Sequence, residues 1–182
     1  MYKKVCILIL VALILMFSES IVRSDVEQPN VWRLQAPWWL ITGKTSPSGF
    51  REFREAIGKS LEGGSLLGGY SGHSLVERAD KHLKSFRQSD IIFLILPKTE
   101  EFEALKELRE KYPELFPVTS KEFRKFSPLV YLTYDIETER MRGVIIASRV
   151  DVCLAEILLE KDLPLNTFFR YEDGKLIEIE GK

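Results

Sequence analysis

Residues 40–50, LITGKTSPSGF, contain parts of two sequence patterns that are associated with different chemistry. Gly43-Lys44-Thr45 matches the end of a phosphate-binding loop, where a lysine and a hydroxyl follow a glycine. Such a loop also needs a glycine five residues earlier, because its backbone must bend tightly to point amides at phosphate. Trp38 stands at that position. The sequence therefore predicts a turn between a strand and a helix here, and not a phosphate site.

The same segment has the spacing of a dithiol redox motif, with hydroxyls in place of the thiols. Thr45-x-Pro47-Ser48 mirrors Cys-x-Pro-Cys. Thiol–disulfide exchange needs a thiolate, which a helix N-terminus stabilises near neutral pH, whereas serine and threonine hydroxyls do not ionise there. We therefore expect no redox chemistry at Thr45 and Ser48.

A second polar group, Tyr70-Ser71-Gly72-His73, follows a glycine-rich stretch. The nucleophile elbow of a hydrolase would be Gly-x-Ser-x-Gly, and His73 stands where its last glycine should be. His73 and His82 are the two histidines of the chain. They lie too far apart on one predicted helix to share a metal, and no cysteine or histidine cluster joins them. We expect neither a metal nor a cofactor.

The strands that would position these residues follow from runs of apolar side chains. Residues 38–42 form a short aromatic and aliphatic strand, and residues 90–97, DIIFLILP, form a continuous apolar strand of the kind buried on both faces of a parallel sheet. SPLVYLTYD and MRGVIIASR are two strands joined by a short polar turn. Asp173-Gly174 predicts a final hairpin.

The helices are marked by capping residues and by helical spacing of apolar side chains. Ser46 or Ser48 would cap a first helix, with Pro47 in its first turn. Ser74 with Glu77 forms a capping box for a second, Thr99 begins a third and Asp151 caps the last. The predicted inward stripe of the first helix consists of Phe50, Phe53, Ile57 and Leu61.

This order of elements predicts an α/β fold with a mixed sheet flanked by helices. Residues 126–162 resemble the C-terminal half of a thioredoxin-like domain. The resemblance extends over roughly residues 90–162 and implies that Ser127-Pro128 stands at the family's cis-proline. It also implies a hairpin of residues 130–134 and 143–149 and a last helix over residues 151–161. Residues 46–61 would then be an N-terminal helical addition.

Two assignments of the family's active-site corner remain open. Thr45–Ser48 matches the proline of the motif, whereas Tyr70-Ser71-Gly72-His73 has the better spacing to Pro128. Under the second assignment the chain also resembles the periplasmic thioredoxin-like (TrbC-like) proteins of F-type conjugative pilus assembly. That resemblance depends on Pro117, Phe123 and Pro128. The thioredoxin-like resemblance implies that Pro128 is a binding residue together with the corner of one assignment or the other, Thr45 and Ser48 or Tyr70, Ser71 and His73.

The first residues predict export. Lys3 and Lys4 precede an apolar run over residues 5–17, which small polar residues follow, as in a secretory signal peptide. The run is short for a membrane span, so the membrane would be contacted only by this segment, if it is uncleaved. We therefore expect a signal peptide over residues 1–24, an arm and strand over residues 25–45, a single domain over residues 46–182, and a periplasmic or secreted location.

Composition and the remaining special residues indicate a protein-contact role. The net charge of −1 gives no electrostatic case for nucleic acid. After cleavage Cys153 alone remains, and its apolar neighbours predict a buried side chain. Trp32, Trp38 and Trp39 either pack under the sheet or form a binding patch for a partner.

The sequence thus favours an exported, non-redox protein that contacts envelope-assembly proteins. The alternative is a hydroxyl-based or ligand-binding enzyme that uses the corner around Ser71, His73 and Pro128.

Overall fold

The computed structural model describes residues 29–61, 65–67, 74–117 and 128–179. The predicted signal segment, Tyr70, Ser71, His73 and the Ser127–Pro128 peptide bond lie outside these residues. Within the described ranges, no helix is both long enough and apolar enough to cross a membrane.

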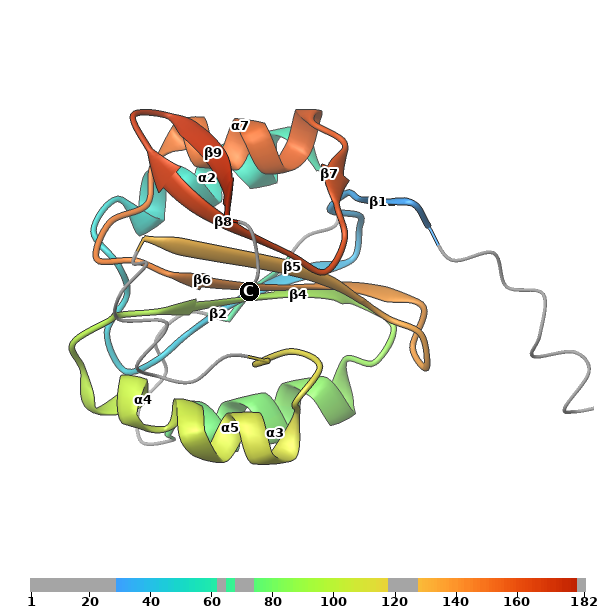
Figure 1. Cartoon of the computed structure of the whole chain (residues 1–182), viewed down its shortest axis with the longest axis vertical. Helices are drawn as coiled ribbons and strands as arrows, with labels where there is room; N and C mark the ends of the chain where they lie inside the picture. The colour runs from blue at the N-terminus through green and yellow to red at the C-terminus, as the bar shows by residue number, and fades with distance from the viewer. Residues whose placement is uncertain (1–28, 62–64, 68–73, 118–127, 180–182) are drawn as a thin grey trace, which may run out of the picture.

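A mixed sheet forms the centre of the molecule (Figure 1). Its order in the described part of the chain is β3-β2-β4-β6-β5-β8-β9. The first four strands in this order are parallel, and the hairpin strands β5, β8 and β9 join on antiparallel. The strands are β2 (Trp38–Thr42), β3 (Ser65–Leu67), β4 (Asp90–Ile95), β5 (Leu129–Asp135), β6 (Arg140–Ile146), β8 (Thr167–Glu172) and β9 (Lys175–Ile179). The predicted α/β class with a mixed sheet is confirmed.

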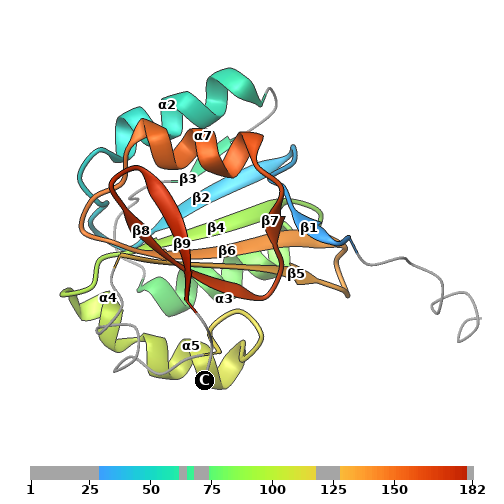
Figure 2. The same ribbon diagram turned by 45° about the horizontal axis from the view of Figure 1, so that its top comes forward.

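Helices cover both faces of the sheet, as Figures 1 and 2 show. One face carries α2 (Phe50–Ser60) and α7 (Val152–Glu160), and the other carries α3 (Leu75–Ser85), α4 (Glu100–Glu103) and α5 (Leu105–Lys111). A hydrophobic core lies on each face of the sheet, and the side chains of β4 alternate between the two. Ile92 and Leu94 face the α2–α7 side, and Ile91 and Phe93 face the other. This explains why β4 is apolar at every position.

The segment before β2 is part of the same fold. Its strand β1 (Val31–Trp32) pairs antiparallel with β7 (Leu163–Pro164), which follows α7. Trp32 is fully buried and its indole Nε1 donates to the carbonyl of Arg142 at 2.9 Å. The predicted extended arm is therefore anchored to the start of β6 and to the chain after α7.

Several local predictions are confirmed. The first strand spans the predicted residues 38–42, and Ser74 and Glu77 form both hydrogen bonds of the capping box. Asp151 accepts a hydrogen bond from the Leu154 amide at the start of α7. The hairpin around Asp173-Gly174 is present and extends the sheet through β8 and β9.

Two local predictions are wrong. The N-cap of α2 is Gly49, in the left-handed conformation and without a side-chain cap, instead of Ser46 or Ser48. Ser48 forms a bridge to Arg149, so its backbone is used in pairing with the β6–α7 connection. Cys153 is exposed, because Leu154, Ala155, Ile157 and Leu158 form the buried side of α7.

Candidate functional site

The predicted corner at Thr45 and Ser48 lies at the carboxyl edge of the parallel strands. The chain leaves β2 towards α2 on one face and leaves the adjacent β4 towards α4 on the other. In open α/β sheets, ligands bind in the crevice at such a switch point. Thr45 and Ser48 are both exposed there.

The loop that carries them is held by Arg78 and by Glu101. Buried Arg78 of α3 donates to the carbonyls of Thr42 and Gly43 at 2.6 and 2.7 Å. The Lys44 amide donates to Glu101 Oε1 at 2.7 Å. Partial burial works to raise the pKa of Glu101, but this amide and other donors hold it below its usual value. A carboxylate of the protein thus occupies the amide that a phosphate loop would offer, in agreement with the exclusion of a phosphate site.

Pro128 also lies at the carboxyl edge, but not beside Thr45–Ser48. It directly precedes β5, and β6 and β4 lie between β5 and β2. At the usual spacing, three strand steps amount to about 14 Å. The structure therefore does not bring these two predicted parts of one corner together.

The predicted tryptophan patch divides into two buried residues, Trp32 and Trp38, and one half-buried residue, Trp39. Trp38 is 2% exposed and belongs to the core on the α2–α7 side, which favours its packing role. Trp39 is half-buried and its ring lies 4.3 Å from that of Phe86 on the opposite face, next to His82. Only Trp39 retains exposed surface that a partner could contact.

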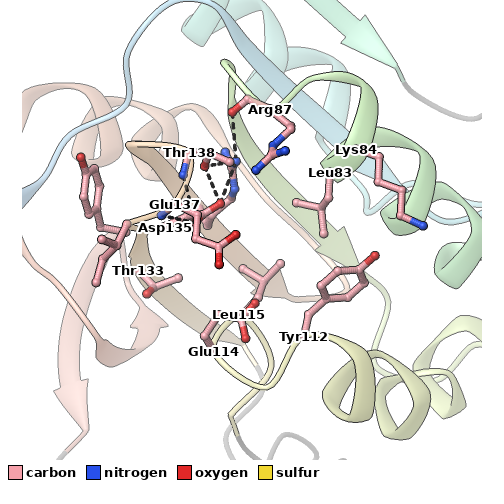
Figure 3. Close-up of a pocket in the computed structure, with 13 residues that line it drawn as sticks. Leu83, Lys84, Arg87, Tyr112, Glu114, Leu115, Thr133, Asp135, Glu137 and Thr138 are labelled. Atoms are coloured by element: carbon pink, nitrogen blue, oxygen red, sulfur yellow. Dashed lines mark hydrogen bonds and ion pairs between the residues drawn. The ribbon is translucent and has the colours of Figure 1, made fainter. Parts of the chain in front are cut away.

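A cleft of about 570 Å³ lies at the other edge of the sheet, between the end of α3, the turn after α5 and the β5–β6 turn (Figure 3). We call it the amino-edge cleft. Leu83 and Leu115 contribute apolar surface to it, and Ile136 of the turn lines it with its side chain 61% exposed. The volume is in the range of small-molecule and peptide-side-chain pockets.

Arg142 fixes the inner wall of this cleft. Its side chain is 3% exposed and donates to the Ser89 carbonyl at 2.6 Å, to Thr138 Oγ1 at 2.8 Å and to Asp135 Oδ2 at 3.3 Å. Burial lowers the pKa of Arg142, and the charges of Asp135 and Asp90 oppose this effect. The guanidinium remains charged and holds the β5–β6 turn against the sheet.

A second polar cluster fixes the opposite wall. Tyr112 donates to Asp80 Oδ1 at 2.6 Å, and Lys111 contacts Asp80 Oδ2 at 3.0 Å. The hydrogen bond from Tyr112 is the main reason that the pKa of Asp80 is lowered. Burial, together with Asp80, raises the pKa of Tyr112. These groups are bound to one another and position the wall.

Four charged side chains of the cleft have no such partner within the described ranges: Lys84 and Arg87, and Glu114 and Glu137. Arg87 extends into the cleft from the end of α3 and Glu137 from the β5–β6 turn (Figure 3). Neither side chain forms an ion pair or a hydrogen bond to another described residue, and both are exposed. The cleft therefore offers an apolar surface together with cations and anions that a ligand could contact.

The arrangement suits binding better than catalysis. None of the described residues form a group of His, Cys, Asp and Glu that could hold a metal ion. Arg142 and Asp135 are paired with each other, as are Tyr112 and Asp80, and the described apolar centre brings no nucleophile and base together.

The sequence did not identify this cleft. Leu83 and Leu115 come from other segments than the β5–β6 hairpin that carries Ile136 and Arg142, and only the tertiary fold places them together. One signal was available: two arginines, Arg140 and Arg142, precede the apolar residues at the end of β6, and a charge in a buried strand must find partners or line a cavity.

No family model, curated protein sequence or solved structure matches this chain.

Proposed function

We propose that this is an exported, non-redox protein that acts by protein–protein contacts in a cell-envelope, secretion or conjugation assembly, and that the amino-edge cleft is its contact site. The observation that supports this contact site is the exposure of Ile136. This apolar side chain is 61% exposed on a turn that a buried arginine holds in place, beside the apolar wall formed by Leu83 and Leu115. Apolar surface that is exposed beside a cleft and surrounded by polar side chains is typical of a contact site.

Export and the envelope assembly are proposed from the sequence alone. The basic start and the apolar run over residues 5–17 support a signal peptide. The finer thioredoxin-like assignment is likewise a proposal. It is supported by the parallel β2–β4 pair, the β5–β6 hairpin and the helix that follows it.

The contact site is tested with a matched pair of variants. Ile136→Asp should abolish co-purification of the partner from an envelope fraction, because the acid would be desolvated against the apolar surface. Ile177→Asp is the control: Ile177 is 44% exposed on β9 and does not line the cleft. Equal recovery of the partner with both variants would contradict the cleft as the contact site.

The absence of redox activity is tested separately. An insulin-reduction assay of the mature protein should show no turnover above buffer, because Thr45 and Ser48 cannot form a disulfide. Turnover that Cys153→Ala abolishes would contradict the non-redox proposal.

The switch point at the carboxyl edge favours a second candidate function, binding or conversion of a small ligand near Thr45 and Ser48. A thermal-shift screen of small metabolites would test it. A ligand whose shift disappears in Thr45→Ala and persists in Ile136→Asp would support this candidate over the cleft.

A further inference from the structure

We propose that the amino-edge cleft binds a short extended segment of the partner polypeptide in which one apolar side chain lies between an acidic and a basic residue. This inference rests on the proposed function and specifies its ligand. The apolar side chain would lie against Leu83, Leu115 and Ile136. The acidic side chain would face Arg87 and the basic one Glu137.

Several polar and charged side chains in or beside the cleft are already bound to other side chains of the protein. Arg142 is bound to Asp135 and Thr138, and Lys111 and Tyr112 are bound to Asp80. A ligand that displaced these contacts would leave a largely buried charge unpaired, which is costly. The charges left for a ligand are therefore those without a described partner: the cations Arg87 and Lys84, and the anions Glu137 and Glu114.

The balance of the lining charges selects a ligand that carries both signs. Of the lining charges, Arg142 and Asp135 are bound to each other, and the others are two cations, Lys84 and Arg87, and two anions, Glu114 and Glu137. A purely acidic segment would meet Glu137 and Glu114, and a purely basic one would meet Lys84 and Arg87. Like charges at a contact oppose binding and opposite charges favour it. A segment of mixed charge alone avoids repulsion on both sides.

The exposed position of Ile136 favours a polypeptide over a small zwitterion. A free amino acid that filled the inner part of the cleft would leave this rim side chain in water. An extended segment continues past the rim and covers Ile136 with its neighbouring residues. The cleft volume of about 570 Å³ also exceeds what one amino acid needs.

Capped tripeptides provide the probe. Acetyl-Lys-Leu-Glu-amide, acetyl-Lys-Leu-Lys-amide and acetyl-Glu-Leu-Glu-amide are titrated into the labelled mature protein, and the Kd is measured from NMR shifts at low salt. The mixed peptide should bind roughly two- to fivefold tighter than either single-sign peptide, since exposed charge pairs contribute about 0.2–1 kcal/mol each.

Charge exchange within the protein makes the test specific. Arg87→Glu and Glu137→Lys should each weaken binding of the mixed peptide roughly two- to fivefold, and the double variant should restore it by reversing the direction of the peptide. Leu83→Ala should weaken all three peptides. Urea denaturation of each variant shows whether it is folded. Equal binding of the three peptides, or no restoration in the folded double variant, would overturn the inference.

A photo-cross-linker at position 136 separates this inference from the proposed function. If it captures a polypeptide in the envelope while the peptides show no charge preference, the contact site stands and the ligand assignment is wrong. If it captures no more than the same group at position 177, the contact site itself is wrong, and the ligand assignment with it.

Discussion

Gly49 begins α2 in a conformation that other residues rarely adopt. Its φ is +74°, and a Cβ built on it would lie 2.1 Å from the Val150 carbonyl oxygen. Gly49→Ala should therefore lower the free energy of unfolding by about 2 kcal/mol or more, through backbone strain and displacement of the 147–151 connection.

Gly58 provides the matched control for this prediction. It lies within the same helix, and a Cβ there would meet no atom within 4 Å. Gly58→Ala should raise the free energy of unfolding by about 0.4–1 kcal/mol. Urea denaturation of both variants measures the two effects, and a loss of the same size at both positions would contradict the role of Gly49.

Asp90 makes stability depend on pH. Burial raises its pKa from 3.8 to about 6, although the Gln35 and Met141 amides and the charge of Arg140 act to lower it. The folded protein thus holds this proton more tightly than the unfolded chain. The contribution of Asp90 is fully present below pH 3.8 and is lost as the pH rises through about 6.

Asp90→Asn should remove this dependence. Between pH 4 and 7, the free energy of unfolding of the native protein should fall relative to that of the variant by roughly 2–3 kcal/mol. Burial lowers the pKa of His82 and gives a trend of opposite sign. That trend is common to both proteins and cancels in the difference. Parallel stability curves over this pH range would show that Asp90 does not titrate there.

At the scale of elements, α3 begins with a capping box, whereas α2 on the opposite face of the sheet begins at Gly49 without a side-chain cap. Ser74 accepts from the Glu77 amide at 3.3 Å, and Glu77 Oε2 accepts from the Ser74 amide at 2.7 Å. Ser74→Ala should cost about 1 kcal/mol of stability. Ser48→Ala, at the start of α2, should cost less than about 0.5 kcal/mol because its side chain caps nothing. Thermal unfolding of both variants tests this, and a larger loss for Ser48→Ala would contradict it.

Elements with local signals could be predicted from the sequence, and those that depend on distant contacts could not. The apolar run of β4 and the box at Ser74 each specify their element within a few residues. The start of α2 depends on Val150, about a hundred residues away, against which only a glycine fits. The exposure of Cys153 depends on which side of α7 faces α2. The cleft depends on the strand order, which no short segment encodes.

At the scale of the molecule, the segment before β2 joins parts that are far apart in the chain. Trp32 belongs to the core between the sheet and the α2–α7 layer, and Arg33 is paired with Asp162 after α7. The Gln35 amide donates to Asp90 Oδ2 at 2.6 Å at the start of β4. The segment therefore connects the beginning of two central strands with the chain that follows the last helix.

Trp32 should accordingly be among the most sensitive positions of the fold. Trp32→Ala should lower the free energy of unfolding by roughly 3–5 kcal/mol, because it removes a fully buried indole and leaves a cavity under the sheet. Trp39→Ala is the control, because it is the same substitution at a half-buried tryptophan, and it should lower the free energy of unfolding by less. Urea denaturation measures both losses.

Trp32 also donates to the Arg142 carbonyl, and the Arg142 side chain holds the turn that carries Ile136 and Glu137. A folded Trp32→Phe variant, which lacks this donor, should therefore bind the mixed-charge peptide more weakly. For the first of these variants, Trp32→Ala, unchanged stability would show that the segment before β2 is peripheral to the fold.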